Sequence, residues 1–97
     1  GDAGYQVVLT ITDQQAALTV QRFPKNAALV ARLSRPDGGA SVTVTQGVTD
    51  SAGAVQLGFA MPAAWDNGQP LTETDLRLSV ATVDGRYTRT ATIQYYR

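Results

Sequence analysis

Apolar and polar residues alternate along most of this 97-residue chain. Side chains on a β-strand point to opposite faces with a period of two, so the alternation predicts strands that turn one face inward. Apolar residues nowhere recur at helical spacing over a helical length, and the many Thr and Val residues favour a pleated surface. The expected strands are 5–12, 16–22, 27–34, 40–48, 54–61, 76–80 and 87–96.

The parity of each run predicts which side chains face the core. In the run 40–48, for example, strict alternation places Val42, Val44 and Val48 on one face. The other residues expected to face inward are Tyr5, Val7, Leu9, Ile11, Leu18, Val20, Leu29, Ala31, Leu33, Val55, Leu57, Phe59, Met61, Leu76, Leu78, Val80, Ala91, Ile93 and Tyr95.

Turn signals separate the expected strands. In the segment 36–39, Pro-Asp-Gly-Gly, Pro presets the first central position and Gly accepts a positive φ. The segment 50–53, Asp-Ser-Ala-Gly, is a second turn signal, and Asp84-Gly85 suits a two-residue hairpin. The segment 62–75 is longer than a simple connection requires. Together these signals predict one all-β domain over 1–97, with about seven short antiparallel strands in a sandwich or barrel.

Composition narrows the functions that this domain can have. The chain is 43% hydrophobic and 16% charged, which favours a globular fold. Eight Lys and Arg balance eight Asp and Glu without a basic run, so nucleic acid is not an expected partner. Cys and His are both absent, which excludes thiolate nucleophiles, His acid–base pairs, disulfides and Cys/His zinc sites. We therefore expect no enzyme, no cofactor and, without an apolar stretch of about 20 residues, no membrane insertion by this segment.

Three segments carry motifs of a known kind. The segment 18–26, Leu-Thr-Val-Gln-Arg-Phe-Pro-Lys-Asn, ends a strand in Phe-Pro and turns at Asn. It resembles the GFPPN pattern of bacterial immunoglobulin-like domains found in tandem in surface and secreted proteins, with Arg22 where that pattern has Gly. The segment 48–62 is similar to their TDANGSFSxxFxxP hairpin. The segment 78–93 is similar to their closing hairpin, although Leu78 or Leu76 stands where the family has Tyr.

The resemblance implies an immunoglobulin-like β-sandwich of about seven antiparallel strands with Greek-key connections. It also implies a non-catalytic spacer or docking domain, excised from a larger bacterial protein that is extracellular or part of the cell envelope. The implied partners are neighbouring domains of the same chain or another surface protein, and adhesion is one role of the family.

The expected loop 62–75 suggests an alternative function. An exposed Trp65 could stack on a sugar ring, with Asp66 and Asn67 as further candidate ligand-binding residues, and the domain would then be a carbohydrate-binding module that acts on a polysaccharide. Tyr96 joins these ligand-binding candidates, because its parity is opposite to that of Tyr95 and favours exposure. The competing interpretation is that Trp65 folds down to cap one end of the sandwich and buries on the order of 200 Å².

The acidic residues offer a weaker metal hypothesis. Asp66, Glu73 and Asp75 are candidate calcium ligands, because carboxylate oxygens bind this ion, although their spacing is not that of an EF-hand. Asp50 and Asp84 are expected at one end of the sandwich, in turns where Asp bonds nearby backbone amides. The other end is expected to hold Asp13, Asp37, Asp66, Glu73 and Asp75.

A polar face is expected on the last hairpin. Arg77 and Arg89 are placed opposite one another, and together with Thr88, Thr90 and Thr92 they describe an outer sheet surface. Such a surface is either solvated or recognises an anion, and solvation is the ordinary state of exposed charges.

Overall fold

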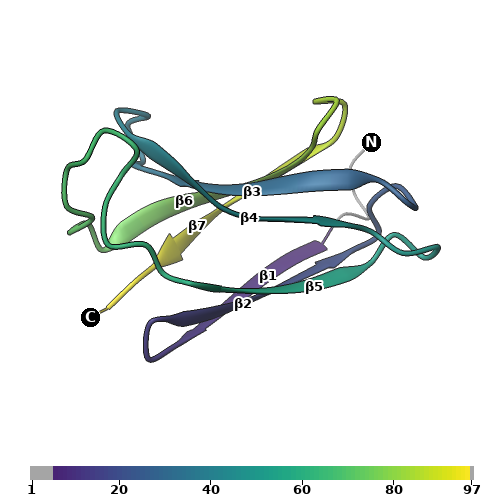
Figure 1. Ribbon diagram of the computed structural model, residues 1–97, viewed down its shortest axis with the longest axis horizontal. Helices are drawn as coiled ribbons and strands as arrows, with labels where there is room; N and C mark the ends of the chain where they lie inside the picture. Colours follow the sequence, from purple (N-terminus) through teal and green to yellow (C-terminus); the bar gives the residue numbers. More distant parts are fainter. Residues whose placement is uncertain (1–5, 97) are drawn as a thin grey trace.

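A computed structural model of the chain describes residues 6–96 and shows two antiparallel sheets packed face to face (Figure 1). One sheet contains β1 (Gln6–Thr12), β2 (Gln15–Gln21) and β5 (Val55–Ala60). The other contains β3 (Ala28–Ser34), β4 (Ser41–Val48), β6 (Asp75–Thr82) and β7 (Thr88–Gln94). The expected all-β fold with seven antiparallel strands in two layers is confirmed, and each strand lies close to its expected position.

The strand order is β1-β2-β5 in one sheet and β4-β3-β6-β7 in the other. The chain crosses between the sheets after β2, β4 and β5, whereas β1–β2, β3–β4 and β6–β7 are hairpins. The connections 22–27, 49–54 and 83–87 meet at one end of the sandwich, which we call the turn end. The segments 13–14, 35–40 and 61–74 meet at the opposite loop end, where β7 also finishes (Figure 1).

The core lies between the sheets and follows the alternation of the sequence. Burial of these side chains removes apolar surface from water, which is the main favourable contribution to folding. The largest fully buried side chains are Leu18, Val20, Leu29, Leu33, Leu76, Leu78 and Val80. Most of the other expected inward residues are buried or pack against this cluster, while Tyr5 lies outside the described residues.

The inward position expected for Val48 is wrong. The register between β3 and β4 shifts so that Ala31 lies opposite Thr45 while Arg32 lies opposite Thr43. The residue of β4 between Thr43 and Thr45 therefore has no partner on β3 and forms a β-bulge. Beyond this bulge, the residues of β4 that were expected to face inward face outward, and the reverse. Gly47 consequently faces Leu57, and Val48 is 60% exposed.

The outward position expected for Arg89 beside Arg77 is also wrong. The β6–β7 register pairs Arg77 with Thr92 and Val80 with Arg89. Residues paired across strands share a face, so Arg89 lies on the same face as the fully buried Val80. It is exposed because β7 is an edge strand, where inward-pointing charges are a common protection against unwanted strand pairing.

Two of the motif segments meet at the turn end. The Phe23 amide donates to the Gly53 carbonyl at 3.0 Å, and the Asn26 amide donates to the Asp50 carbonyl at 3.1 Å. Between them lies the buried Thr49, whose hydroxyl donates to the Pro24 carbonyl at 2.6 Å. We call this set of contacts the clasp, because it ties the β2–β3 connection to the β4–β5 turn.

The backbone of the clasp contains conformations that favour glycine. Arg22 and Asn26 have φ values of 65° and 52°, so both adopt the left-handed conformation that glycine tolerates best. Gly53 has a φ of 78°, and a Cβ added there would lie 1.9 Å from the Phe23 carbonyl oxygen. Gly53 therefore serves both the turn and the close approach of the two segments.

Gly53→Ala is expected to destabilise the domain more than Gly38→Ala does. Both glycines have a φ of 78°, but a Cβ at Gly38 meets no atom within 4 Å. Gly38→Ala should lower the free energy of unfolding by about 1 to 2 kcal/mol through backbone strain. Gly53→Ala should lose about 1 to 3 kcal/mol more, because the clasp must open. Urea unfolding of both variants measures the difference, and equal losses would contradict the clasp.

Candidate functional site

Trp65 lies in the core at the loop end rather than on the surface. Its side chain is 3% exposed, and its indole N–H donates to Glu73 Oε1 at 3.2 Å. The Arg35 guanidinium carbon lies 5.8 Å from the centroid of the indole ring, within the range of a cation–π contact. The capping interpretation of Trp65 is thus confirmed. The ring faces are not open to a sugar, which corrects the placement of Trp65 among the ligand-binding candidates.

Arg35 organises the long loop around Trp65. Its Nε atom forms an ion pair with Glu73 Oε2, and its terminal nitrogen donates to Gln69 Oε1 at 2.8 Å. Burial raises the pKa of Glu73, but hydrogen bonds from its own amide, Trp65, Arg35 and Thr72 outweigh burial and leave the pKa below its usual range. The loop 61–74 is therefore shaped by contacts made within the loop end.

Asp66 and Asn67 also have structural partners. Asp66 lies 3.8 Å from the Arg32 guanidinium in an exposed ion pair, which contributes little stability. The Asn67 side chain accepts a hydrogen bond from the Gln69 amide at 2.9 Å, which shapes the tip of the loop. Neither residue lies beside Tyr96 at the cavity described below.

The three candidate calcium ligands are not brought together. Glu73 is paired with Arg35, and Asp75 accepts a long hydrogen bond of 3.5 Å from Gln94. Within residues 6–96, no group of three acidic side chains is arranged to hold a metal ion. The calcium hypothesis for Asp66, Glu73 and Asp75 is therefore not supported by their positions.

The burial of Trp65 predicts its fluorescence. It is the one Trp of the chain, so the emission reports on this residue. Acrylamide should quench the folded protein much less than the protein unfolded in urea. A Trp65→Phe, Tyr96→Trp variant supplies the exposed control and should be quenched strongly in the folded state. Equal quenching of the wild-type protein and this variant would contradict the cap.

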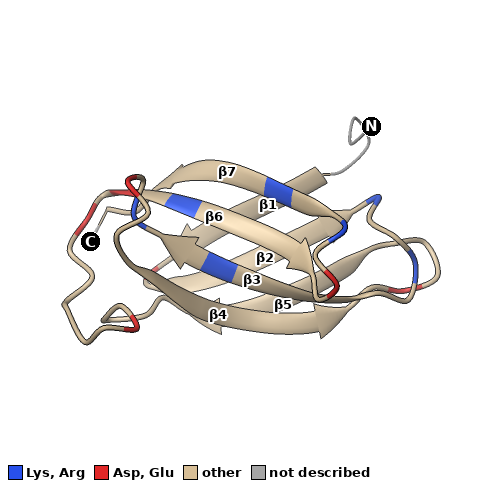
Figure 2. Ribbon diagram, turned by 90° about the horizontal axis from the view of Figure 1, so that it is seen from above, with Lys and Arg blue, Asp and Glu red and all other residues tan. Residues whose placement is uncertain are grey.

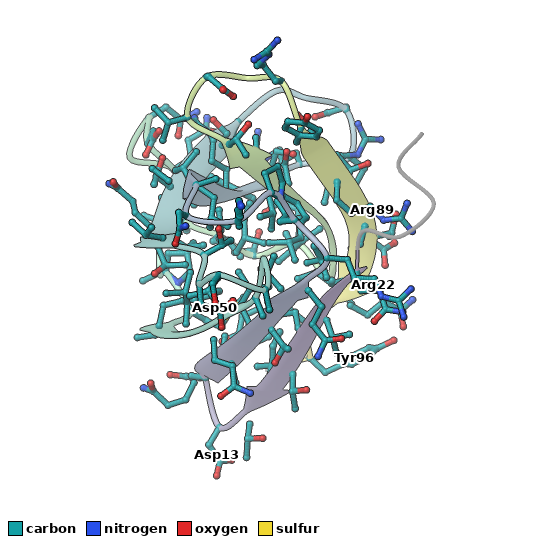
Figure 3. All side chains as sticks on the ribbon, turned by 90° about the vertical axis from the view of Figure 1, so that its right-hand side faces the viewer. Asp13, Arg22, Asp50, Arg89 and Tyr96 are labelled. Carbon is teal, nitrogen blue, oxygen red and sulfur yellow. The ribbon has the colours of Figure 1, made fainter. Side chains whose placement is uncertain are left out.

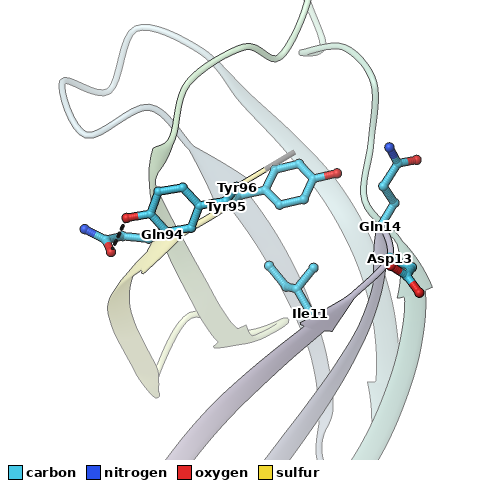
Figure 4. Close-up of a pocket in the computed structure, with 6 residues that line it drawn as sticks. All are labelled: Ile11, Asp13, Gln14, Gln94, Tyr95 and Tyr96. Atoms are coloured by element: carbon cyan, nitrogen blue, oxygen red, sulfur yellow. Dashed lines mark hydrogen bonds between the residues drawn. The ribbon is translucent and has the colours of Figure 1, made fainter.

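A cavity of about 380 Å³ opens at the loop end, between the β1–β2 turn and the end of β7 (Figure 4). Tyr95 is buried and Tyr96 is 74% exposed, as their parity predicts. Figure 4 shows their rings pointing in opposite directions, and the Tyr96 hydroxyl donates to Gln94 Oε1 at 2.8 Å. The cavity is lined by Ile11, Asp13, Gln14, Gln94, Tyr95 and Tyr96.

The β1–β2 turn at this cavity is unusual in lacking glycine. Asp13 and Gln14 have φ values of 51° and 69°, a pair of positive angles that usually selects Asn-Gly or Asp-Gly. Sequence alone did not reveal the cavity, because its residues come from two strands of different sheets. The three-residue gap between the first two alternating runs, 13–15, is the signal that could have located its turn.

The carboxylates of the turn end are engaged with their own turns. Asp50 Oδ1 accepts hydrogen bonds from the Ala54 and Ala52 amides, which lower the pKa of Asp50. Asp84 Oδ1 accepts a hydrogen bond of 2.6 Å from the Thr82 hydroxyl, the main reason why the pKa of Asp84 is also lowered. The predicted turn function of both aspartates is confirmed, and Asn26 lies beside them through its contact with Asp50.

Because the pKa of Asp50 is lowered in the folded state, the free energy of unfolding depends on pH in the acidic range. Its folded-state pKa lies below the ordinary value of 3.8, so its contribution is complete above that value and is lost as the pH falls through the folded-state pKa. Asp50→Asn retains an acceptor for both amides but does not titrate. The free energy of unfolding should therefore fall less steeply with acid in Asp50→Asn than in the wild-type protein. Urea unfolding from about pH 5 to about pH 2 tests this, and identical slopes would contradict it.

Comparison with models of known protein families gave no match, and a search of curated proteins found no similar sequence. No helix that could cross a membrane is present in the part of the chain that the structure describes.

Proposed function

We propose that this chain is a non-catalytic spacer or docking domain of a multidomain bacterial cell-surface or secreted protein. We further propose that its topology is an immunoglobulin-like Greek key. The pairing of β3 with β6, which are distant in sequence, supports this topology. The clasp supports the proposed family, because the residues that resemble its motifs form contacts with one another.

The observation that carries the function is the path of the chain through the sandwich. The strand β1 begins at the turn end, and β7 finishes at the loop end (Figure 1). The molecule measures 37 × 26 × 21 Å, so domains joined through these ends are separated along the long axis. Domains joined end to end in this way extend the protein by the long dimension of each domain, which is what a spacer must do.

The same path suits a domain that carries tension. Strands β1 and β7 are edge strands of different sheets, and each pairs along its length with an inner neighbour, β2 or β6. Inter-strand hydrogen bonds in antiparallel sheets run perpendicular to the strands. Tension between the start of β1 and the end of β7 therefore loads these bonds in shear, so that many must break together.

Single-molecule pulling in two geometries tests this function. The chain has no Cys, so introduced thiols are unique attachment points. Handles at Gln6→Cys and Tyr96→Cys load both edge strands in shear, whereas handles at Asp13→Cys and Tyr96→Cys lie at one end and peel β7 from β6. We expect a higher unfolding force in the first geometry. A force no higher than that of the peeling control would contradict the spacer function.

A further inference from the structure

The charges of the described residues are divided between the two ends of the sandwich. Figure 2 shows most of the acidic positions at the end where β7 finishes. The turn-end half has four bases against two acids, namely Arg22, Lys25, Arg86 and Arg89 against Asp50 and Asp84. The loop-end half has five acids against three bases, namely Asp13, Asp37, Asp66, Glu73 and Asp75 against Arg32, Arg35 and Arg77. The described residues thus form a positive end and a negative end, although their bases and acids are equal in number.

Within the described residues, no base of the turn end forms an ion pair, although the charge of Arg86 is one of the causes that lower the pKa of Asp84. Both ion pairs found within residues 6–96, Arg32–Asp66 and Arg35–Glu73, belong to the loop-end half. The Asp50 carboxylate faces backbone amides of its own turn rather than a base. Figure 3, which looks onto the turn end, shows Arg22 and Arg89 on one side and Asp50 across from them.

Exposed apolar side chains accompany this positive charge. Val48 is 60% exposed and Val83 is 69% exposed. Ala28 connects them, because it pairs with Val48 across the sheet and its carbonyl accepts from the Val83 amide at 3.0 Å. Exposed apolar groups gathered in this way are typical of contact surfaces.

The loop end has the complementary features. Its cavity has apolar walls contributed by Ile11, Tyr95 and Tyr96, and Asp13 places a carboxylate among its lining residues. The exposed Tyr96 ring is oriented by its hydrogen bond to Gln94, and oriented tyrosines are frequent at protein contacts. A cavity with an acidic border suits an apolar side chain that is surrounded by bases.

We propose that the turn end of one copy of this domain docks on the loop end of a second copy, with Val83 directed to the cavity beside Tyr96. This inference deepens the proposed spacer function and rests on it, because it assigns the contact made between successive domains. The two surfaces differ, so the contact is heterologous and leaves one free end of each kind. Copies are therefore added in a row along the long axis.

The contact is expected to be weak between separate molecules and effective between linked ones. The surplus of two charges that the described residues give each end is screened over about 8 Å at physiological salt. Short linkers, by contrast, raise the effective concentration of a neighbour to the millimolar range. The appropriate measurement is thus concentration-dependent sedimentation and NMR of the 97-residue protein up to about 1 mM.

Two variants test the turn end and the loop end separately, because each variant alters only one of these surfaces. The turn-end variant carries Lys25→Glu, Val83→Glu and Arg86→Glu, and the loop-end variant carries Asp13→Asn and Tyr96→Lys. Each variant keeps one native end and loses the other, so neither should associate alone. Their mixture should form a dimer that grows no further, while the wild-type protein forms longer rows with amide shifts at both ends.

The control adds acidic charge elsewhere on the surface. Gln46 and Thr90 are exposed on the four-stranded sheet, and a Gln46→Glu, Thr90→Glu variant should associate as the wild-type protein does. Altering either end should raise the Kd at least about tenfold, which corresponds to 1.4 kcal/mol. Added salt should weaken the wild-type contact, because opposite charges attract across it.

The outcomes distinguish this contact from the spacer function. Self-association of either variant alone, or a mixture that behaves as two monomers, overturns the head-to-tail contact. A wild-type protein that remains monomeric to about 1 mM overturns it as well. High resistance in the pulling experiment would still support the spacer function in each of these cases. Low resistance in pulling together with a dimer in the mixture would reject the spacer and retain the contact.

Discussion

The packing of two alternating apolar faces against one another holds every other feature of this domain in place. Leu18 and Val20 come from the three-stranded sheet and are fully buried against the leucines of the four-stranded sheet. Each such side chain contributes about 1.5 to 3 kcal/mol relative to an exposed position. Because the apolar side chains of the strands stabilise the fold, the connections at both ends can be held by polar contacts instead.

The two ends use their polar groups in different ways. At the turn end, the buried Thr49 hydroxyl bonds to the backbone, and the exposed Asp50 carboxylate accepts from amides of its own turn rather than from a base. At the loop end, Arg35 is drawn into the structure by Glu73 and Trp65, which leaves much of the acidic charge at the surface. Local contacts thus engage the acids of the turn end with its own backbone and hydroxyl groups, whereas at the loop end they also pair acids with bases.

Strand positions and most of the core followed from the sequence, because a period of two is a direct record of which face is buried. The face of Val48 did not, since a bulge inserts one residue without altering the local alternation. Arg89 was misplaced because its charge was taken as a sign of an outward position, although alternation along the last strand puts it on the same face as Ala91 and Ile93. The burial of Trp65 could be stated only as one of two alternatives, because it depends on Glu73 and Arg35, which lie at a distance in sequence. The cavity escaped prediction for a related reason, as its two halves are contributed by different sheets.

The inward-facing Arg89 on the edge strand β7 affects how many copies can share a crowded surface. A second β7 approaching from the side would have to strip water from the guanidinium group, and an ion without a partner is costly to desolvate. Sideways growth of the sheet into an aggregate is therefore disfavoured along this flank. Copies held at high local density can therefore remain separate along this flank, without their sheets merging through β7.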